Sequence, residues 1–294
     1  MQARLIAYPP DDAAVVRLVP ADARLRIGRV GDCDLVLDHA SVSRAHAEIR
    51  GDGGQWRLVD LDSKNGSHVD GVRIKDAPLR QSCWLRFGDV YCEFTPLTEA
   101  QAAADALKHR EHRHVATAHT VRIEKLTRLG DLLDASLRAV LELAQCERGF
   151  VLFEEGGRLM VRASLSLTPQ ALAAQAFSGS VGAVRRALEH RRIVVANDIG
   201  QEAWLASRDS VVAAGLSALV CVPLLEDGRV LGAIYADRIT RGEAITTLDL
   251  ELLQAFAENA SVWIAARRTS EQLEALGDAA AWSQIVAAHT ERSP

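Results

Sequence analysis

The sequence predicts two modules, an all-β sandwich followed by an α+β domain. Residues 1–97 contain short runs of Val, Ile, Leu and aromatic residues separated by Gly, Asp, Asn or Pro. Residues 98–122 form an Ala-rich, highly charged run that carries four of the nine histidines. From residue 123 to residue 267, apolar residues at helical spacing alternate with strand-like runs. A chain of 294 residues is long enough for two domains with hydrophobic cores of ordinary size.

Composition and charge exclude several classes of protein. The net charge is −5 with both signs mixed along the chain, which argues against broad nucleic-acid binding. Charges interrupt every apolar run before the roughly 20 residues that a membrane span requires. The N-terminus lacks the apolar core of a signal peptide. The five cysteines form no CxxC pair, which indicates a reducing cytosol. We therefore expect a cytoplasmic protein that contacts neither nucleic acid nor membrane directly.

The first module is expected to be a β-sandwich, because many short strands with frequent turn signals are typical of that architecture. No stretch within residues 1–97 has a helical period over a useful length. The expected strands are Ala3–Tyr8, Val15–Val19, Arg24–Ile27, Leu35–Leu37, His46–Arg50, Trp56–Leu61, Trp84–Phe87 and Tyr91–Thr95.

Residues 98–122 are predicted to form a charged helical linker. Their apolar side chains are too few and too small to bury a face alone, so the helix is expected to be exposed or to pair with a copy of itself. His109 and His112 share one helix face, whereas His114 lies off it. No carboxylate or cysteine set completes a metal shell, so we expect no metal site.

The second module, residues 123–267, is expected to be an antiparallel sheet with flanking helices. Helical spacing runs from Ile123 to Ala144, and the final helix is capped by Thr246, with Asp249 three residues later. These first and last helices are expected to pack together. Between them we expect strands Gly149–Phe153 and Leu159–Ala163, a helix opening at Thr168-Pro169, helix Ser180–His190, strand Ile193–Ala196, and a hairpin of Ala218–Leu225 and Val230–Asp237. In the tail, residues 268–294, the helix is expected to end at Gly277-Asp278 and to resume briefly over Ala280–Ala288.

Three polar clusters in the first module are candidates for an anion site. Gly28-Arg29, Ser43–His46 and Ser63–Gly66 stand between strand-like runs at similar intervals. A phosphothreonine carries nearly two negative charges and three acceptor oxygens. Its recognition requires a guanidinium fork, hydroxyl and backbone donors, and a second cation. The clusters supply such groups, so we expect loops of one β scaffold to converge on a phosphorylated ligand.

The motifs in these three clusters resemble those of a known family. Gly28-Arg29, Ser43 with His46, and Ser63, Asn65 and Gly66 with the trailing Asp70-Gly71 make residues 1–97 resemble an FHA (forkhead-associated) domain, the β-sandwich that reads phosphothreonine peptides. The resemblance implies that Arg29 and Ser43 contact the phosphate. It also implies that Arg44 and Lys64 flank the phosphate and that Asn65 bonds the peptide backbone. Gly28, His46 and Gly66 would support the site, His46 as a buried strut and Gly66 in a turn that needs positive φ. Ser67 stands where the family usually has Thr, which retains the hydroxyl and loses a methyl.

The order of elements over residues 123–267 resembles a GAF domain. Members of that family hold small ligands in a pocket between the sheet and the segments that cover it. By that resemblance the candidate pocket residues are Phe177, Ile199, Trp204 and Leu205. The cyclic-nucleotide signature of the family is absent, and so is a Cys-His pair of the kind that binds a bilin. A ligand-free, dimer-forming GAF domain and a ligand-binding one both remain open, and no cofactor is expected.

Catalysis has little support in the sequence. Ser43 and His46 imitate a nucleophile–base pair without an accompanying acid or oxyanion arrangement. Neither a P-loop nor a G-x-G-x-x-G follows a strand. We therefore expect a non-enzymatic signalling adaptor that binds a Thr-phosphorylated protein, a Ser/Thr kinase or its substrate, and forms a homodimer through the GAF helices. One alternative is the sensory N-terminal part of a longer transcription activator or nucleotide-cyclase-type enzyme. Another is a structural dimeric scaffold that binds no phosphate.

Overall fold

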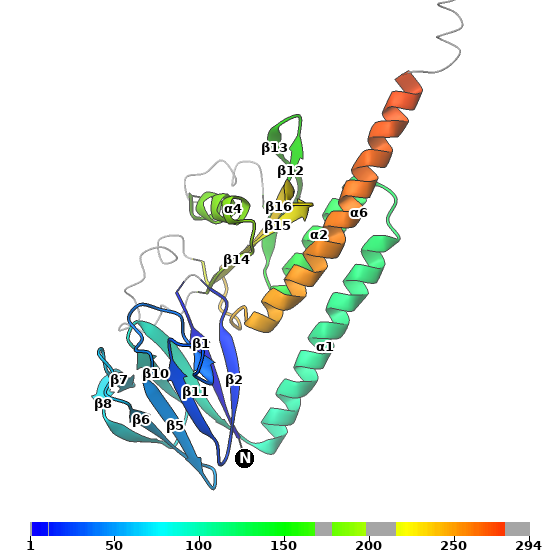
Figure 1. Cartoon of the computed structure of the whole chain (residues 1–294). Helices are drawn as coiled ribbons and strands as arrows, with labels where there is room; N and C mark the ends of the chain where they lie inside the picture. The colour runs from blue at the N-terminus through cyan, green and yellow to red at the C-terminus, as the bar shows by residue number, and fades with distance from the viewer. Residues whose placement is uncertain (1, 11, 168–177, 198–215, 280–294) are drawn as a thin grey trace, which may run out of the picture.

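The protein is described by a computed structural model that covers residues 2–10, 12–167, 178–197 and 216–279. Figure 1 shows a sandwich at the N-terminal end, then a long helix, then a sheet with helices on its faces. The predicted multidomain fold, an all-β sandwich and an α+β domain joined by a helix, is thereby confirmed.

The sandwich consists of two sheets. One has the strand order β2-β1-β11-β10-β7-β8 and the other β4-β3-β5-β6-β9. Their strands are β1 (Gln2–Tyr8), β2 (Val15–Pro20), β3 (Arg24–Gly28), β4 (Leu35–Val36), β5 (Ala47–Asp52), β6 (Gln55–Asp60), β7 (Ser67–Val69), β8 (Val72–Ile74), β9 (Asp76–Leu79), β10 (Cys83–Phe87) and β11 (Val90–Leu97). Alternate residues of β1 and β3, among them Leu5 and Ile27, are fully buried between the sheets. Phe87 of β10 and Phe94 of β11, in the same sheet as β1, complete this core.

The sequence-based prediction omitted β7, β8 and β9. These strands are only three or four residues long and carry few buried side chains, so the alternation that reveals a strand is absent. The sequence nevertheless contained a turn signal between two of these strands. Asp70 and Gly71 have φ values of 48° and 82° and join β7 to β8 as a two-residue hairpin loop, with Val69 opposite Val72. An Asp-Gly pair between two short runs is typical of such a turn.

The linker helix α1 (Glu99–Glu124) differs from the prediction. It was expected to be exposed or to pair with a second copy, but it packs along α2 (Leu129–Leu143) and α6 (Thr247–Ala279) of the same chain. Ala116 and Ile123 are buried in that contact. Most of the other residues of α1 are exposed, so the helix packs along only one narrow side. The helical period expected from Ile123 onward is also interrupted, because the chain turns at residues 125–128 between α1 and α2.

The second module contains an antiparallel sheet of order β13-β12-β16-β15-β14. Helices α2 and α6 cover one face, and α4 covers the other (Figure 1). The remaining elements are β12 (Arg148–Glu155), β13 (Arg158–Leu165), α4 (Ser178–His190), β14 (Val194–Asn197), β15 (Ala218–Glu226) and β16 (Arg229–Arg238). Helix α6 continues through Gly277-Asp278, where an interruption was predicted. One glycine costs a helix only about 1 kcal/mol, which is too little to end it. The predicted helix openings at Thr168-Pro169 and Ala280 lie outside the described residues.

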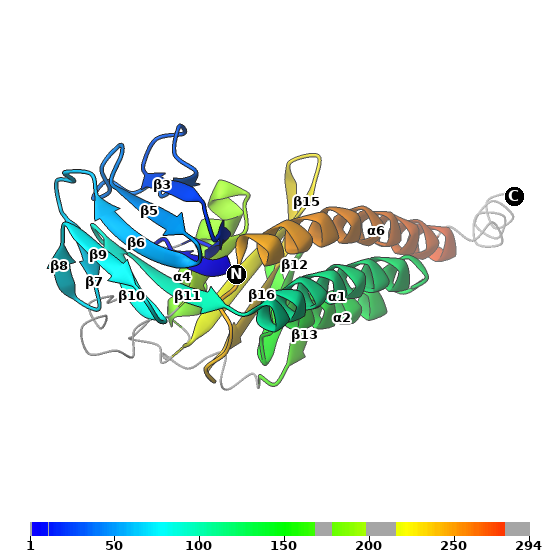
Figure 2. The same cartoon turned by 90° about the horizontal axis from the view of Figure 1, so that it is seen from below.

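The two modules contact each other directly. The loop between β1 and β2 reaches the segment before α6, where the Ala14 N–H donates to the Ile245 carbonyl at 2.9 Å and the Thr247 N–H donates to the Ala14 carbonyl at 2.8 Å. Arg4 of β1 forms an ion pair with Asp105 of α1 at 2.9 Å. Figure 2 shows α1, α2 and α6 running side by side away from the sandwich. Within the described ranges, no helix is long and apolar enough to cross a membrane.

Candidate functional site

The structure brings the three polar clusters together at one end of the sandwich. Arg29 follows β3, Ser43 lies in the loop between β4 and β5, and Lys64 lies in the loop between β6 and β7. The Arg29 N–H donates to the Ser43 carbonyl at 3.0 Å. The Lys64 N–H donates to Ser43 Oγ, also at 3.0 Å. Ser43 is therefore the residue through which the three loops are joined.

His46 supports this arrangement from the interior. Its side chain is fully buried and packs edge-on against Phe87, with the ring centroids 5.6 Å apart. Nδ1 accepts a hydrogen bond from the Ser43 N–H at 3.0 Å, and Nε2 lies 3.2 Å from the Gly66 carbonyl. Because Nδ1 faces a donor, the ring hydrogen must be on Nε2, which donates to Gly66. Burial lowers the pKa of His46, which keeps the ring neutral and this pattern intact at pH 7.

A carboxylate that sequence reasoning missed holds the third loop. Asp60 at the end of β6 accepts hydrogen bonds from the Ser63 N–H at 3.0 Å and from the hydroxyls of Ser63 and Ser67 at 2.6 and 2.7 Å. Burial alone would raise its pKa, but these bonds outweigh burial and lower the pKa below its usual value. A signal existed in the sequence, because Asp followed by Ser three residues later is a common turn pairing.

Asn65 is fixed by a residue that the sequence analysis did not identify. Its Nδ2 donates to the Ser41 carbonyl at 2.7 Å. Ser41 in turn accepts the Asp89 N–H at its Oγ, 2.8 Å away, so the turn between β10 and β11 also contributes. Asn65 Oδ1 has no hydrogen-bond partner among the described residues, so it is an open acceptor on an amide whose orientation is fixed. Such an acceptor suits a peptide N–H.

Two glycines of the site are required for different reasons, Gly28 by close packing against backbone and Gly66 by its positive φ. A Cβ on Gly28 would lie 2.2 Å from the Arg44 carbonyl oxygen and 2.8 Å from Cys33 Sγ, so no side chain fits. Gly66 has a φ of 78°, and a Cβ there would lie 2.5 Å from Arg73 Nε. Only glycine meets both requirements without strain. Both positions were predicted to support the site.

The positively charged side chains of the site form no ion pairs with the described residues. The side chains of Arg29, Arg44 and Lys64 are exposed, and no described residue forms an ion pair with them. The nearby Lys75 differs, because its ammonium lies 2.7 Å from Asp62. The backbone contacts therefore place three positively charged residues next to Ser43: Arg29 and Lys64 through hydrogen bonds and Arg44 as its neighbour in the chain. The Ser43 hydroxyl accepts the Lys64 N–H and retains its own hydrogen for donation. The arrangement is chemically suited to a doubly charged oxyanion.

The four residues proposed for a small-ligand pocket in the second module, Phe177, Ile199, Trp204 and Leu205, lie outside the described residues. The described sheet face beneath α4 is occupied by stacked Phe150 and Tyr235 rings, 5.1 Å apart. The Tyr235 hydroxyl donates to Asp237 at 2.8 Å, and Arg148 pairs with the same carboxylate. This part of the face is therefore filled by the protein's own side chains.

Comparison with known proteins agrees with the two-module organisation. Residues 25–88 match the FHA domain family, and residues 128–264 match the GAF domain family. The transcriptional regulatory protein EmbR of Mycobacterium tuberculosis is 51% identical over 72 residues, which are 24% of this chain and 19% of EmbR. The glycogen accumulation regulator GarA of Mycolicibacterium smegmatis is 39% identical over 61 residues, 21% of this chain and 39% of GarA.

These relatives match only the first module, and the chain spans about a fifth of the length of EmbR and about two fifths of that of GarA. Among solved structures, M. tuberculosis EmbR in complex with a low-affinity phosphopeptide is 36% identical, with 31% of this chain and 24% of that chain covered and a TM-score of 0.26.

Proposed function

Because this chain carries an FHA domain followed by a GAF domain, we propose that it is a non-enzymatic signalling adaptor that captures Thr-phosphorylated proteins. The observation that carries this proposal is the junction of three loops at Ser43, which His46 supports from the interior and which brings Arg29, Arg44 and Lys64 next to one another without ion-pair partners among the described residues. The proposed contacts are Arg29, Ser43, Arg44, Lys64 and Asn65.

Each contact has a distinct chemical task. The guanidinium of Arg29 presents a fork of N–H donors that fits two phosphate oxygens at once. Ser43 donates its hydroxyl hydrogen to a phosphate oxygen, while Arg44 and Lys64 offset the second negative charge. Asn65 accepts a peptide N–H at Oδ1 and so orients the segment that bears the phosphate. The partner is a Ser/Thr kinase or a substrate of such a kinase.

The deciding experiment is binding of the full chain to a degenerate phosphothreonine-peptide library. The unphosphorylated library serves as the control, and a phosphoserine library measures the contribution of the threonine methyl. We expect retention of the phosphothreonine peptides alone. Equal retention of phosphorylated and unphosphorylated peptides would rule out the proposed site and favour the purely structural scaffold.

Dimerisation through the GAF helices is a second proposed property, and the geometry of α6 supports it. Helix α1 packs against both α2 and α6, and one side of α6 stays open in this helical layer. That side carries a stripe of exposed residues separated alternately by four and three positions: Ala255, Asn259, Val262, Ala266, Thr269 and Leu273. Val262 and Leu273 are 64% and 63% exposed.

The alternation of four and three is the spacing by which two helices pack as a coiled coil. The polar members of the stripe are already partnered within the helix, since Asn259 donates to the Ala255 carbonyl and Thr269 to the Ala265 carbonyl. Burying them against a second copy therefore leaves the Thr269 hydroxyl hydrogen and one Asn259 N–H satisfied within the helix. A dimer would also make phosphopeptide binding bivalent and raise avidity for clustered phosphosites.

Sedimentation of the full chain tests the dimer. We expect a concentration-dependent dimer that Val262→Glu combined with Leu273→Glu converts to monomer. Leu18→Glu on β2 is the matched control, because Leu18 is also an exposed apolar residue, at 51%, but lies on the sandwich. A wild-type chain that stays monomeric at high concentration would contradict this proposal without affecting the phosphopeptide site.

A regulatory role within a longer protein is the alternative, favoured by the similarity to EmbR, whose name describes a transcriptional regulator. The length of the parent reading frame separates this role from a stand-alone adaptor. Sensing of a small molecule by the GAF domain is compatible with either role. A thermal-shift screen of nucleotides and metabolites tests it, because a ligand selective for the folded state raises the apparent stability.

A further inference from the structure

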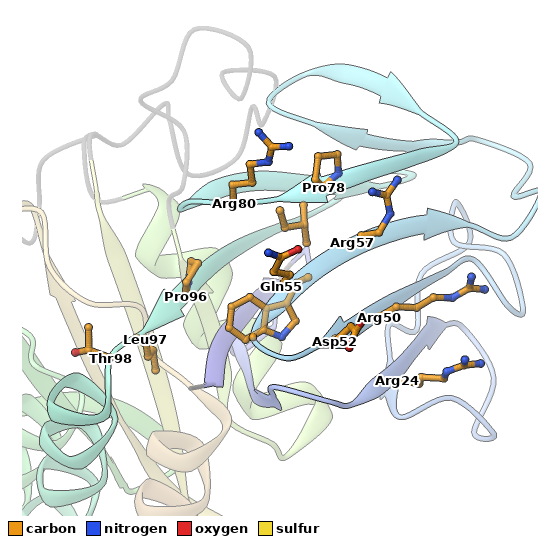
Figure 3. A pocket seen from close by; sticks show the side chains of 14 residues that line it. Arg24, Arg50, Asp52, Gln55, Arg57, Pro78, Arg80, Pro96, Leu97 and Thr98 are labelled. Carbon is orange, nitrogen blue, oxygen red and sulfur yellow. The ribbon is translucent and has the colours of Figure 1, made fainter.

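A second groove lies on the FHA sandwich (Figure 3). Four arginines line it: Arg24 of β3, Arg50 of β5, Arg57 of β6, and Arg80 just after β9. Apolar parts of the lining come from Trp56, Pro78, Leu79, Pro96 and Leu97.

The strand register places three of the arginines side by side. Arg24 lies directly opposite Arg50, and Arg50 lies directly opposite Arg57. Figure 3 shows them extending from neighbouring strands of one sheet. Like charges at directly opposed positions destabilise a sheet. An anion bound across the row would relieve that repulsion.

The ion pairs within the sandwich leave guanidinium N–H groups in this groove that can still donate hydrogen bonds. Arg50 Nε pairs with Glu48 at 2.5 Å, and Arg57 pairs with one oxygen of Asp76 at 2.9 Å. These pairs leave other guanidinium N–H groups of both arginines open. No described residue forms an ion pair with Arg24 or Arg80. Asp52 is the one carboxylate in the described lining, so the groove has an excess of positive charge.

We propose that this groove binds an acidic, unphosphorylated segment of a protein partner. Carboxylates of Asp and Glu accept the paired N–H groups of guanidinium in the planar geometry that arginine favours. The aliphatic stems of an acidic peptide would contact Pro78, Leu97 and the arginine side chains themselves.

A peptide suits the groove better than a nucleic acid does. Single-stranded nucleic acids bind on open aromatic faces, but Trp56 is only 4% exposed and its Nε1 donates to the Pro20 carbonyl. The chain as a whole has a net charge of −5, which repels a long polyanion. A short acidic segment meets the local positive charge without extending over the acidic remainder of the surface.

The groove is separate from the phosphate site. Arg24 begins β3, and Arg29 follows its end, so the two sites lie toward opposite ends of one strand. Five residues of extended chain span about 17 Å. The proposal therefore does not depend on phosphothreonine recognition. A partner that carries a phosphothreonine and an acidic stretch some residues away would engage both sites and gain from the raised effective concentration.

The test is fluorescence anisotropy of labelled octaglutamate with the full chain at low salt, beside a labelled Gly-Ser peptide and octathymidylate. We expect octaglutamate to bind, the Gly-Ser peptide not to bind, and added salt to weaken binding. Arg24→Glu combined with Arg80→Glu should weaken octaglutamate binding about tenfold or more, because charged hydrogen bonds are lost at two positions. The same variant should bind a phosphothreonine peptide as tightly as wild type, which shows that it is folded.

A matched charge-reversal control is Arg110→Glu with Arg113→Glu on the exposed side of α1. This control changes the net charge equally and should leave most octaglutamate binding intact. Three results would each overturn the proposal: no octaglutamate binding by wild type, an equal loss in the α1 control, or octathymidylate binding as tight as octaglutamate. None of them bears on the phosphothreonine site, which is read out separately.

Discussion

The Nδ1 atom of His46 accepts a hydrogen bond from the backbone N–H of Ser43 at 3.0 Å. Through this contact a fully buried, neutral ring fixes the backbone of Ser43, a half-buried residue whose hydroxyl is proposed to meet the phosphate. The opposite ring nitrogen reaches Gly66 in another loop. One interior side chain therefore sets the relative position of two loops. The exposed side chains of Arg44 and Lys64 extend from these loops.

Arg29→Ala should abolish measurable binding of a phosphothreonine peptide while the protein still unfolds cooperatively. The side chain is exposed and makes no ion pair with a described residue, so its removal costs the fold little. Losing a charged hydrogen bond to the phosphate costs about 1.5–3 kcal/mol of binding free energy. Calorimetric titration measures the effect, with Arg17→Ala on β2 as an exposed arginine control. Undiminished binding by Arg29→Ala would show that the site is wrongly assigned.

His46→Ala should lower both stability and phosphopeptide affinity. The truncation leaves the Ser43 N–H and the Gly66 carbonyl without partners in the interior. Two such groups, together with the lost packing against Phe87, correspond to about 2–4 kcal/mol of unfolding free energy. Urea unfolding followed by Trp fluorescence measures this loss. His109→Ala, at an exposed position of α1, should leave stability nearly unchanged. A stable His46→Ala variant with intact affinity would contradict the supporting role.

The same histidine predicts a pH dependence. Burial lowers the pKa of folded His46 below the value of about 6.5 expected in the unfolded chain. The unfolded state therefore binds the proton more readily, and this contribution to stability is complete above pH 6.5 and is lost as the pH falls through the folded pKa. NMR titration of the ring should find His46 neutral, with hydrogen on Nε2, well below pH 6.5. A ring that titrates at or above that pH would refute the assignment.

Features that depend on a few neighbouring residues could be predicted from the sequence, whereas contacts between distant segments could not. The clusters around Arg29, Ser43 and Asn65 are short motifs, and the structure brings them together at one end of the sandwich. The role of Asp60 was not predicted, because its partners Ser63 and Ser67 come within hydrogen-bond distance only in the folded loop. Most of α1 is exposed, as expected, but its contact with α2 and α6 was not predicted because it depends on which surface those helices present.

Asn197→Ala should loosen the contact between the two modules. The Asn197 amide donates to the Ile245 carbonyl at 3.0 Å and accepts the Ile245 N–H at 2.8 Å, and the same carbonyl accepts the N–H of Ala14 from the sandwich. Removing both bonds should cost about 1–3 kcal/mol. Hydrogen exchange at Ala14 and Ile245 should accelerate more than exchange in β5, far from the contact. Uniform acceleration throughout the sandwich would indicate general destabilisation instead.

His112→Ala should destabilise the protein more at pH 6 than at pH 8.5. His112 of α1 lies 3.0 Å from Asp249, which also accepts hydrogen bonds from Thr246 at the start of α6. The hydrogen bond with Asp249 raises the pKa of His112, against the effect of burial. Its stabilisation is therefore complete below pH 6.5 and is lost as the pH rises through the raised pKa. Because both groups are partly solvated, we expect a loss of about 1–2 kcal/mol at the lower pH. Urea unfolding at the two pH values measures it, with His109→Ala as the control. Equal destabilisation at both pH values would mean that His112 contributes packing and not charge.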